Sequence, residues 1–465
     1  MFMACKMGLK CSNKYLRRAG GISILLLSVG LILVIASVGI AQEPQASPSA
    51  QELLAQQKRI STDTTFVTLA AIPVFFMNLG YALWSTVLCG EQLGKAIRQH
   101  LMILALSIFA FWALGFGLMF GNGNPFFGTE GLFLLSGADN SPATGDAYQG
   151  AYSSMSWAGI PLNIKFLFLV SNVVVSTSIL VSTFIRQRKP SVVLIFCLLF
   201  VCFIYPITGH WIWGGGWLAL MGFWDWGGST VIFSVSGWAA LVGVRVFGSD
   251  EELHNNIENI SEPQSINILY VGFLILCLGL IILNTGSTIG FGNGELINHI
   301  AITTMASAIG GAIGAIITCW IYLRRQNTTR IMQGILSGLV AISASCAFVG
   351  TAWAVEIGFI ASILTFLFLD YLKKNKIPDM SGLISIHLVG GTWGTLSVGL
   401  FAAGESNASN ALYLFGPAVG LFNGGSFQQL FQQLVGIIAA GIFAALLSWI
   451  FCLVIKFSTK SNSIE

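Results

Sequence analysis

His387 and Asp225 are polar residues in otherwise largely apolar stretches of the sequence. His387 sits inside the run GLISIHLVGGTWGTLSVGL, and Asp225 lies in HWIWGGGWLALMGFWDWGGST. An imidazole gains and loses a proton near neutral pH, so His387 can exchange hydrogen bonds or a proton with a small solute. A carboxylate before an apolar stretch can accept the first free N–H groups of a helix. We therefore expect Asp225 to cap a helix that begins near Gly228 and Ser229.

The composition excludes a water-soluble globule, a disordered chain and a nucleic-acid-binding protein. Of the 465 residues, 55% are hydrophobic and only 9% are charged, and the mean hydropathy is +0.79. A soluble domain usually carries about 25% charged residues. The nine cysteines show no C-x-x-C spacing, so we predict neither a metal site nor a disulfide framework. We expect no enzymatic activity, no catalytic residues and no cofactor.

Eleven apolar stretches are long enough to cross a bilayer. Backbone polar groups in hydrocarbon must form hydrogen bonds within their own segment, so helices are expected. We predict an all-α polytopic membrane protein with eleven transmembrane helices. The stretches cover about 66–89, 101–121, 166–185, 191–209, 229–247, 268–288, 300–323, 331–350, 352–372, 383–403 and 434–455.

Lysine and arginine residues gather at one end of these stretches. They are Lys95, Arg98, Arg186, Arg188, Lys189, Arg245, Arg324, Arg325, Arg330, Lys373, Lys374, Lys376, Lys456 and Lys460. The loops at the other end contain none, and Lys165, at the mouth of the third stretch, is the nearest exception. The positive-inside rule therefore predicts an outside mature N-terminus and a cytoplasmic C-terminus in the plasma (inner) membrane.

The N-terminus has the order of a secretory signal. Basic residues between positions 6 and 18 precede an apolar run from about 22 to 40, and Ala41-Gln42 opens a polar segment. We predict that the signal is removed. A retained membrane anchor is the alternative, because the run is long enough to span. The predicted organisation is a signal peptide (1–41), an extracytoplasmic segment (42–62), a membrane domain (63–457) and a short cytoplasmic tail (458–465).

The fifth and tenth stretches share a pattern. Phe233 is followed four residues later by Gly237, and His387 is followed four residues later by Gly391. Five stretches separate the two segments, so their helices run in opposite directions. This is typical of a five-plus-five inverted repeat with a transport path at the interface of the halves.

Several ordered segments resemble the ammonium transporter (Amt/Mep/Rh) family. They are HWIWGGGWLALMGFWDWGGST, IPDMSGLISIHLVGGTWGTLSVGLFA, SGLVAISASCAFVG, FGNGNPFFGTEGLFLLSG and LNTGST, spread over about residues 64–457. The resemblance implies the ammonium-transporter fold and a homotrimer with one pore through each subunit. It also implies conduction of ammonium, or of ammonia derived from it, into the cell.

The family's functional positions fall on named residues of this chain. Trp213 matches the vestibule tryptophan, Ser287 the vestibule serine, Asp225 the acidic residue near the recruitment site, and His387 the second of the twin pore histidines. The resemblance therefore implies that ammonium binds beside Trp213, Ser287 and Asp225, and that His387 lines the pore.

Three positions depart from the family pattern. The first pore histidine falls on Phe233 in a gapless alignment from His210 onward. The two aromatic residues of the outer constriction fall on Phe168 and Asn172, so only one of them is kept, and a second phenylalanine gate falls on Leu283. A phenylalanine fills the volume of an imidazole but has no exchangeable proton. Either neutral ammonia passes a single-histidine pore, or conduction is slow or absent.

Ammonium needs such a site because dehydrating it is costly, on the order of 20 kcal/mol by an idealised Born estimate. An aromatic face contributes about 0.5–2 kcal/mol toward holding the cation, and a serine oxygen accepts a hydrogen bond from one of its N–H groups. A narrow apolar pore then passes the neutral form and rejects potassium, which cannot lose a proton.

We interpret the chain as an ammonium transporter or channel, with two alternatives. The first alternative is a poorly conducting ammonium sensor, since Trp213 and Ser287 accompany a substituted Phe233. The second is a channel for another small neutral solute, since Asn172 and Leu283 loosen the outer gate. The expected partners are ammonium or ammonia, the lipid bilayer and two further copies of the chain. Because the tail FSTKSNSIE is short, binding of a cytoplasmic nitrogen-signalling protein is left undecided.

Overall fold

The structure is a computed structural model that describes residues 49–134, 139–184, 190–247, 263–289, 294–404 and 416–461. The predicted signal peptide, the cations Arg186, Arg188 and Lys189, and the end of the tail (462–465) lie outside the described residues. The chain divides into two compact units, residues 5–59 and the remainder.

The first described helix begins with a capping box. The backbone N–H of Ser49 donates to Glu52 Oε2 at 2.6 Å, and the N–H of Glu52 donates to Ser49 Oγ at 3.3 Å. These reciprocal bonds satisfy N–H groups that the first turn leaves free. The helix therefore begins at Ala50, well before the apolar stretch that was predicted from residue 66.

Apolar helices make up most of the described chain. The first half contains α2 (Ala50–Cys89), α3 (Leu93–Ala110), α4 (Phe116–Phe120), α5 (Leu162–Phe184), α6 (Pro190–Leu199), α7 (Tyr205–Ile212), α8 (Trp217–Met221) and α9 (Val235–Phe247). The π-helical turns η1 (Phe111–Gly115) and η5 (Phe200–Ile204) join α3 to α4 and α6 to α7, and η6 (Ser229–Ser234) leads into α9.

The second half has α10 (Pro263–Gly286), α11 (Gly294–Thr318), α12 (Thr328–Ile342), α13 (Thr351–Lys374), α14 (Gly390–Phe401) and α15 (Phe427–Ser461). The π-helical segment η8 (Cys319–Leu323) extends α11, and η9 (Ser385–Val389) leads into α14. Short 3₁₀ turns are η2 (Leu132–Leu134), η3 (Gly145–Ala147), η4 (Ser153–Met155) and η11 (Leu421–Asn423). Within the described ranges, β pairing is limited to one bridge between Gly123 and Gly128.

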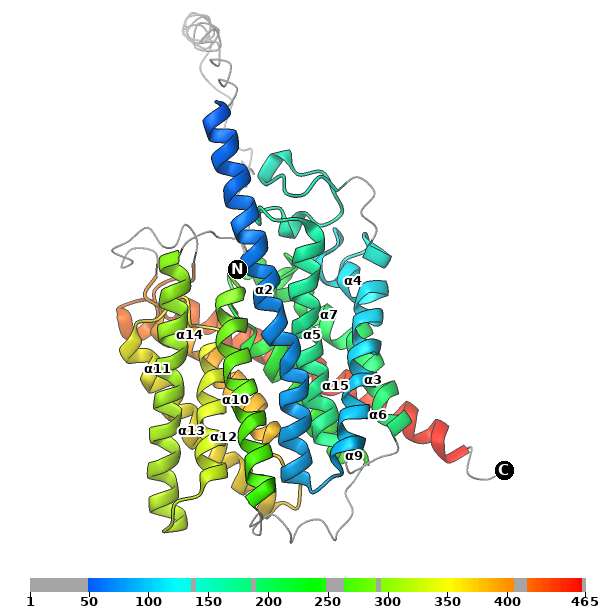
Figure 1. Ribbon diagram of the computed structural model, residues 1–465, viewed down its shortest axis with the longest axis vertical. Helices are drawn as coiled ribbons and strands as arrows, with labels where there is room; N and C mark the ends of the chain where they lie inside the picture. Colours follow the sequence, from blue (N-terminus) through cyan, green and yellow to red (C-terminus); the bar gives the residue numbers. More distant parts are fainter. Residues whose placement is uncertain are drawn as a thin grey trace, which may run out of the picture. The chain divides into compact units, whose positions relative to one another are not determined.

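The helices within residues 60–465 pack side by side, as Figure 1 shows. In the second half α11 packs on α12 and α13, and in the first half α3 packs on α5. α15 runs obliquely behind the other helices and contacts α9 and α14. The protein is therefore an all-helical bundle of membrane-spanning segments, as the apolar stretches predict.

All eleven predicted stretches correspond to helical segments, but two are short. Nine helices of the described chain are long and apolar enough to cross a bilayer, whereas α12 covers 15 residues and η9 with α14 covers 5 and 12. The predicted helix over 331–350 is wrong in its last part, because α12 ends at Ile342.

The irregular backbone after α12 is stabilised by the loop before η6. The N–H groups of Trp226 and Gly227 donate to the carbonyls of Ala344 (3.1 Å) and Ser343 (2.7 Å). The N–H of Ala344 donates to Ser229 Oγ at 2.7 Å. Non-helical backbone at membrane depth is tolerated only where protein groups satisfy it in this way. The two repeat halves therefore meet through backbone hydrogen bonds at this level.

Candidate functional site

His387 lies in the interior of the bundle, on η9. Its side chain is 2% exposed, and its ring centroid lies 5.5 Å from that of Phe233 and 5.7 Å from that of Tyr81. The three rings come from η9, η6 and α2, so segments far apart in the sequence meet at one point. The structure thus brings together the two predicted pore residues, His387 and Phe233, and adds Tyr81.

The hydrogen bonds of His387 define its tautomer. The Nδ1 atom lies 2.7 Å from the carbonyl oxygen of Leu383, which can only accept, so Nδ1 carries the proton. In the neutral ring, Nε2 then holds the lone pair, and the hydroxyl of Tyr81 donates to it at 2.8 Å. The proton-accepting nitrogen of His387 is therefore occupied by a hydroxyl of the protein.

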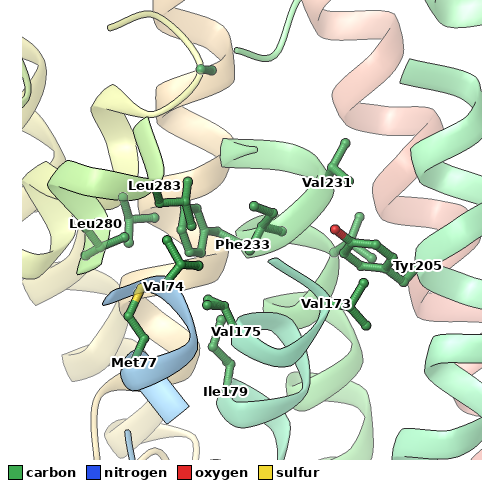
Figure 2. Packing of buried hydrophobic residues seen from close by; sticks show 14 of the residues in the cluster. Val74, Met77, Val173, Val175, Ile179, Tyr205, Val231, Phe233, Leu280 and Leu283 are labelled. Carbon is green, nitrogen blue, oxygen red and sulfur yellow. The ribbon is translucent and has the colours of Figure 1, made fainter. Parts of the chain in front are cut away.

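Phe233 fills the space next to this imidazole. It is completely buried on η6, and Figure 2 shows it among Leu283 of α10, Val74 of α2 and Val175 of α5. Its ring is tilted by 39° relative to the ring of His387. An apolar ring thus takes the neighbouring position at which a second imidazole would exchange protons.

Asp225 caps the helix that carries Phe233, which confirms the capping prediction. Its Oδ1 accepts the N–H of Gly228 at 3.1 Å, and its Oδ2 accepts the N–H groups of Thr230 and Val231, each at 2.9 Å. Burial raises the pKa of Asp225 to about 6, although the backbone N–H groups lower it. The indole Nε1 of Trp213 donates to the backbone carbonyl of Asp225 at 2.7 Å, so the capping loop also fixes the Trp213 ring.

The second repeat has the same cap. Asp379 accepts the N–H groups of Ile384 (3.1 Å) and Ser385 (2.8 Å), and also the Ser385 hydroxyl (2.7 Å). Burial raises the pKa of Asp379 as well. Asp225 precedes Phe233 by eight residues, and Asp379 precedes His387 by eight. Each half of the molecule therefore presents one ring from a capped π-helical turn, and the structure supports the predicted inverted repeat.

Glycines allow the two π-helical segments to cross closely. A Cβ on Gly237 would lie 2.6 Å from the backbone N and Cα of Leu388, and a Cβ on Gly391 would collide with the backbone of Ser229 and Ser234. Hydroxyl pairs join the same segments: Thr230 with Thr395 at 2.6 Å and Ser234 with Thr392 at 3.2 Å. The four-residue spacing between each ring and its glycine thus marks the crossing point of the repeats.

The predicted outer constriction lies on α5 and α10. The ring of Phe168 packs on Gly286, since a Cβ there would be 2.5 Å from the ring carbon Cε2. The next residue, Ser287, donates its hydroxyl to the carbonyl of Leu283 at 2.8 Å, which leaves its oxygen lone pairs free to accept. Asn172 is buried on α5. All eight predicted site residues are buried, and each is at most 3% exposed.

The chain matches a known family along most of its length. A family model described as the Ammonium Transporter Family covers residues 65–463. The chain belongs to the ammonium transporter family. A putative ammonium transporter of Synechocystis sp. is 29% identical over 394 residues, 82% of this chain and 84% of that protein. The ammonium transporter Amt2 of Archaeoglobus fulgidus is 29% identical over 390 residues, covering 81% and 78%.

A solved structure supports the fold of this family member. A structure described as a sensor Amt protein superimposes with a TM-score of 0.73 at 27% identity, covering 86% of this chain and 94% of that one. The chain is thus a multi-pass membrane protein of a transporter family and not of an enzyme family.

Sequence reasoning missed two residues that contact the predicted site residues or repeat their pattern, Tyr81 and Asp379. Asp379 could have been found from its spacing, because it precedes His387 by eight residues, as Asp225 precedes Phe233. Tyr81 gave no signal, because a tyrosine in an apolar stretch is an ordinary buried or interfacial residue. Its contact with His387 joins positions 306 residues apart and depends on helix packing.

Proposed function

We propose that this ammonium transporter family member recruits ammonium beside Trp213 and Ser287 and conducts it past the single pore imidazole of His387. The observation that carries this proposal is the position of His387. It is buried in the bundle interior at the crossing of the two repeats, with its lone pair on Nε2. A residue with only a lipid-facing role would not be placed there.

Recruitment requires a cation-binding face and an acceptor. The indole of Trp213 is held in one orientation by its bond to the Asp225 carbonyl, and its ring face attracts a cation. The hydroxyl oxygen of Ser287 accepts a hydrogen bond from an N–H group of ammonium. The carboxylate of Asp225 is already engaged by backbone N–H groups, so Asp225 positions Trp213 and contributes its charge through space.

Passage beyond this point favours the neutral molecule, because the path is lined by apolar side chains. Phe233 and Leu283 are fully buried there and offer no polar atom. Ammonia that reaches His387 competes with the Tyr81 hydroxyl for the lone pair on Nε2. Tyr81 thus replaces the missing second imidazole as the hydrogen-bond partner of His387, and opening requires that this bond break.

The orientation and assembly are also part of the proposal. The cationic loops support a cytoplasmic C-terminus and an outside mature N-terminus in the plasma membrane. Large apolar side chains are exposed on four of the outer helices, for example Phe76, Leu274, Ile309 and Ile442. These surfaces suit contact with lipid and with two further subunits of a homotrimer.

A sensor is the second candidate function. The occupied Nε2 of His387 and the buried ring of Phe233 describe a closed path, and a sensor Amt protein has a similar fold. In that case ammonium binds at Trp213 without crossing. Family membership favours ammonium over another small neutral solute in both candidates.

Flux and current measured together on purified protein in liposomes test the proposal. We expect methylammonium uptake that is lost in Trp213→Leu and reduced in His387→Ala. We expect a larger current in Phe233→His, which restores a second proton-accepting imidazole. Flux that is lost in Trp213→Leu but retained in His387→Ala would remove the pore assignment. Ammonium-dependent tryptophan fluorescence without flux would establish the sensor instead.

A further inference from the structure

Asn172 carries a buried amide oxygen that has no hydrogen-bond partner. The residue is 1% exposed, and its Oδ1 makes no hydrogen bond with any other described residue. A buried polar atom without a partner destabilises a fold by about 1–3 kcal/mol. Such an atom therefore requires an explanation, and one explanation is an absent ligand.

The neighbouring polar side chains of α5 are all satisfied. Ser171 Oγ donates to the carbonyl of Phe168 at 2.6 Å, and Ser178 Oγ donates to that of Val174 at 2.6 Å. Ser176 Oγ reaches across to the carbonyl of Ile232 at 3.2 Å. The unpartnered oxygen is thus particular to Asn172 and is not a general property of this helix.

The position of Asn172 on α5 places it on the proposed path. Helical spacing puts Asn172 on one face with Val175 and Ile179, at i, i+3 and i+7. Figure 2 shows Val175 and Ile179 on the side of α5 that faces α2, near Val74 and Met77. Phe168, the residue of the outer constriction, lies one turn earlier on the same face. Asn172 therefore lies between Phe168 and the level of Phe233.

We propose that Asn172 Oδ1 accepts a hydrogen bond from an N–H group of ammonium at the outer constriction, one turn after Phe168 on α5, before the ion loses its proton. This inference rests on the proposed function and names a second coordination point for the same substrate. An oxygen without a donor selects a ligand rich in N–H groups, and a charged donor forms the stronger bond. The ligand class is ammonium and small primary ammonium ions, which can donate an N–H group to this oxygen.

The Asn172→Leu variant tests this site, because leucine is similar in size and cannot accept a hydrogen bond. We expect the KM for ammonium uptake in liposomes to rise about tenfold, the factor that corresponds to about 1.4 kcal/mol. We also expect the Tm of the ligand-free protein to rise, because the unpartnered oxygen is gone. Asn172→Met provides a second apolar replacement if leucine disturbs folding.

The matched control is Ser171→Ala, which removes a buried polar group whose bond stays within its own helix. Its KM should equal that of the unsubstituted protein. Asn172→Leu and Asn172→Met variants that keep the original ammonium KM would overturn the site.

A binding measurement separates this inference from the proposed function. Ammonium should raise the Tm of the unsubstituted protein, and Asn172→Leu should reduce that shift. If the Tm shows this pattern but no flux is measured, the Asn172 site is supported and the transport proposal is disproved. If the protein transports ammonium but Asn172→Leu changes neither the Tm shift nor the KM, the Asn172 site is disproved and the transport proposal stands. A protein with neither flux nor a Tm shift loses both.

Discussion

At the scale of single residues, the site is defined by the two side chains that flank the His387 ring, Phe233 and Tyr81. In the proposed pore, Phe233 offers no exchangeable proton, and the hydroxyl of Tyr81 donates to the Nε2 lone pair of His387. Because His387 Nδ1 is tied to the carbonyl of Leu383, the ring cannot offer its other nitrogen instead. Under the proposed function, conduction thus depends on the Tyr81 hydroxyl as well as on the His387 imidazole.

Removing that hydroxyl should increase conduction. In Tyr81→Phe the Nε2 lone pair of His387 has no protein donor, so ammonia no longer competes with a bond of about 1 kcal/mol. We expect ammonium uptake in liposomes to rise about fivefold, which corresponds to that free energy.

The control is Tyr205→Phe. Tyr205 is also fully buried, but its hydroxyl makes no hydrogen bond within the described residues. Its removal should leave uptake unchanged. Equal or lower uptake in Tyr81→Phe would show that this hydroxyl does not hold the path closed.

At the scale of elements, the site is built from one unit used twice. Each unit is a buried aspartate, a π-helical turn that carries one ring, and a glycine four residues after the ring. A π-helical turn often occurs at a functional site, because it changes the direction of a side chain within an otherwise regular helix. The glycines then let the two units cross at backbone distance.

A methyl group at the crossing should separate the units. In Gly391→Ala the new Cβ meets the backbone of Ser229 and Ser234, which cannot move as a side chain can. We expect a loss of about 1–3 kcal/mol in the free energy of unfolding, visible as a lower Tm, together with reduced uptake. Gly94→Ala is the control, because its Cβ would meet nothing within 4 Å. Equal Tm values for the two variants would contradict the close crossing.

The buried cap should make stability depend on pH. Burial raises the pKa of Asp225 from its ordinary value of 3.8 to about 6, so the folded protein disfavours the ionised carboxyl. Its contribution to stability is full below about pH 3.8 and is lost as the pH rises through 6, by about 3 kcal/mol.

Asparagine does not titrate, so the Tm of Asp225→Asn should fall less steeply between pH 4 and 6 than that of the unsubstituted protein. Asp379 retains its own raised pKa, so a residual slope should remain. Identical slopes in the two proteins would show that Asp225 is not the titrating group.

At the scale of the whole molecule, orientation decides which end of the path receives ammonium. The loop that contains Asp146 and the turn at Gln326 lie on opposite predicted sides, and both residues are exposed. The described cysteines are buried or half-buried, so they give little background in a labelling experiment.

An impermeant maleimide applied to intact cells should therefore label Asp146→Cys and spare Gln326→Cys. Both variants should react once the membrane is opened, which controls for accessibility. The reverse pattern in intact cells would invert the orientation and place the Trp213 vestibule on the cytoplasmic side.

Properties that depend on local composition could be predicted without coordinates. Apolar length predicted all eleven helical segments, since a backbone in hydrocarbon must satisfy its own hydrogen bonds. The capping role of Asp225 followed from its place before an apolar stretch. The spacing from ring to glycine identified the inverted repeat, because the same short pattern recurs in both halves.

Which side chains meet depends instead on how whole helices pack. The Tyr81–His387 hydrogen bond and the unpartnered oxygen of Asn172 depend on how α2, α5 and η9 pack, and no local pattern encodes that packing. The end of α12 at Ile342 has the same origin, because groups from the other repeat satisfy the backbone that follows it. Contacts between distant segments are set by the fit of whole helices, which composition and spacing do not contain.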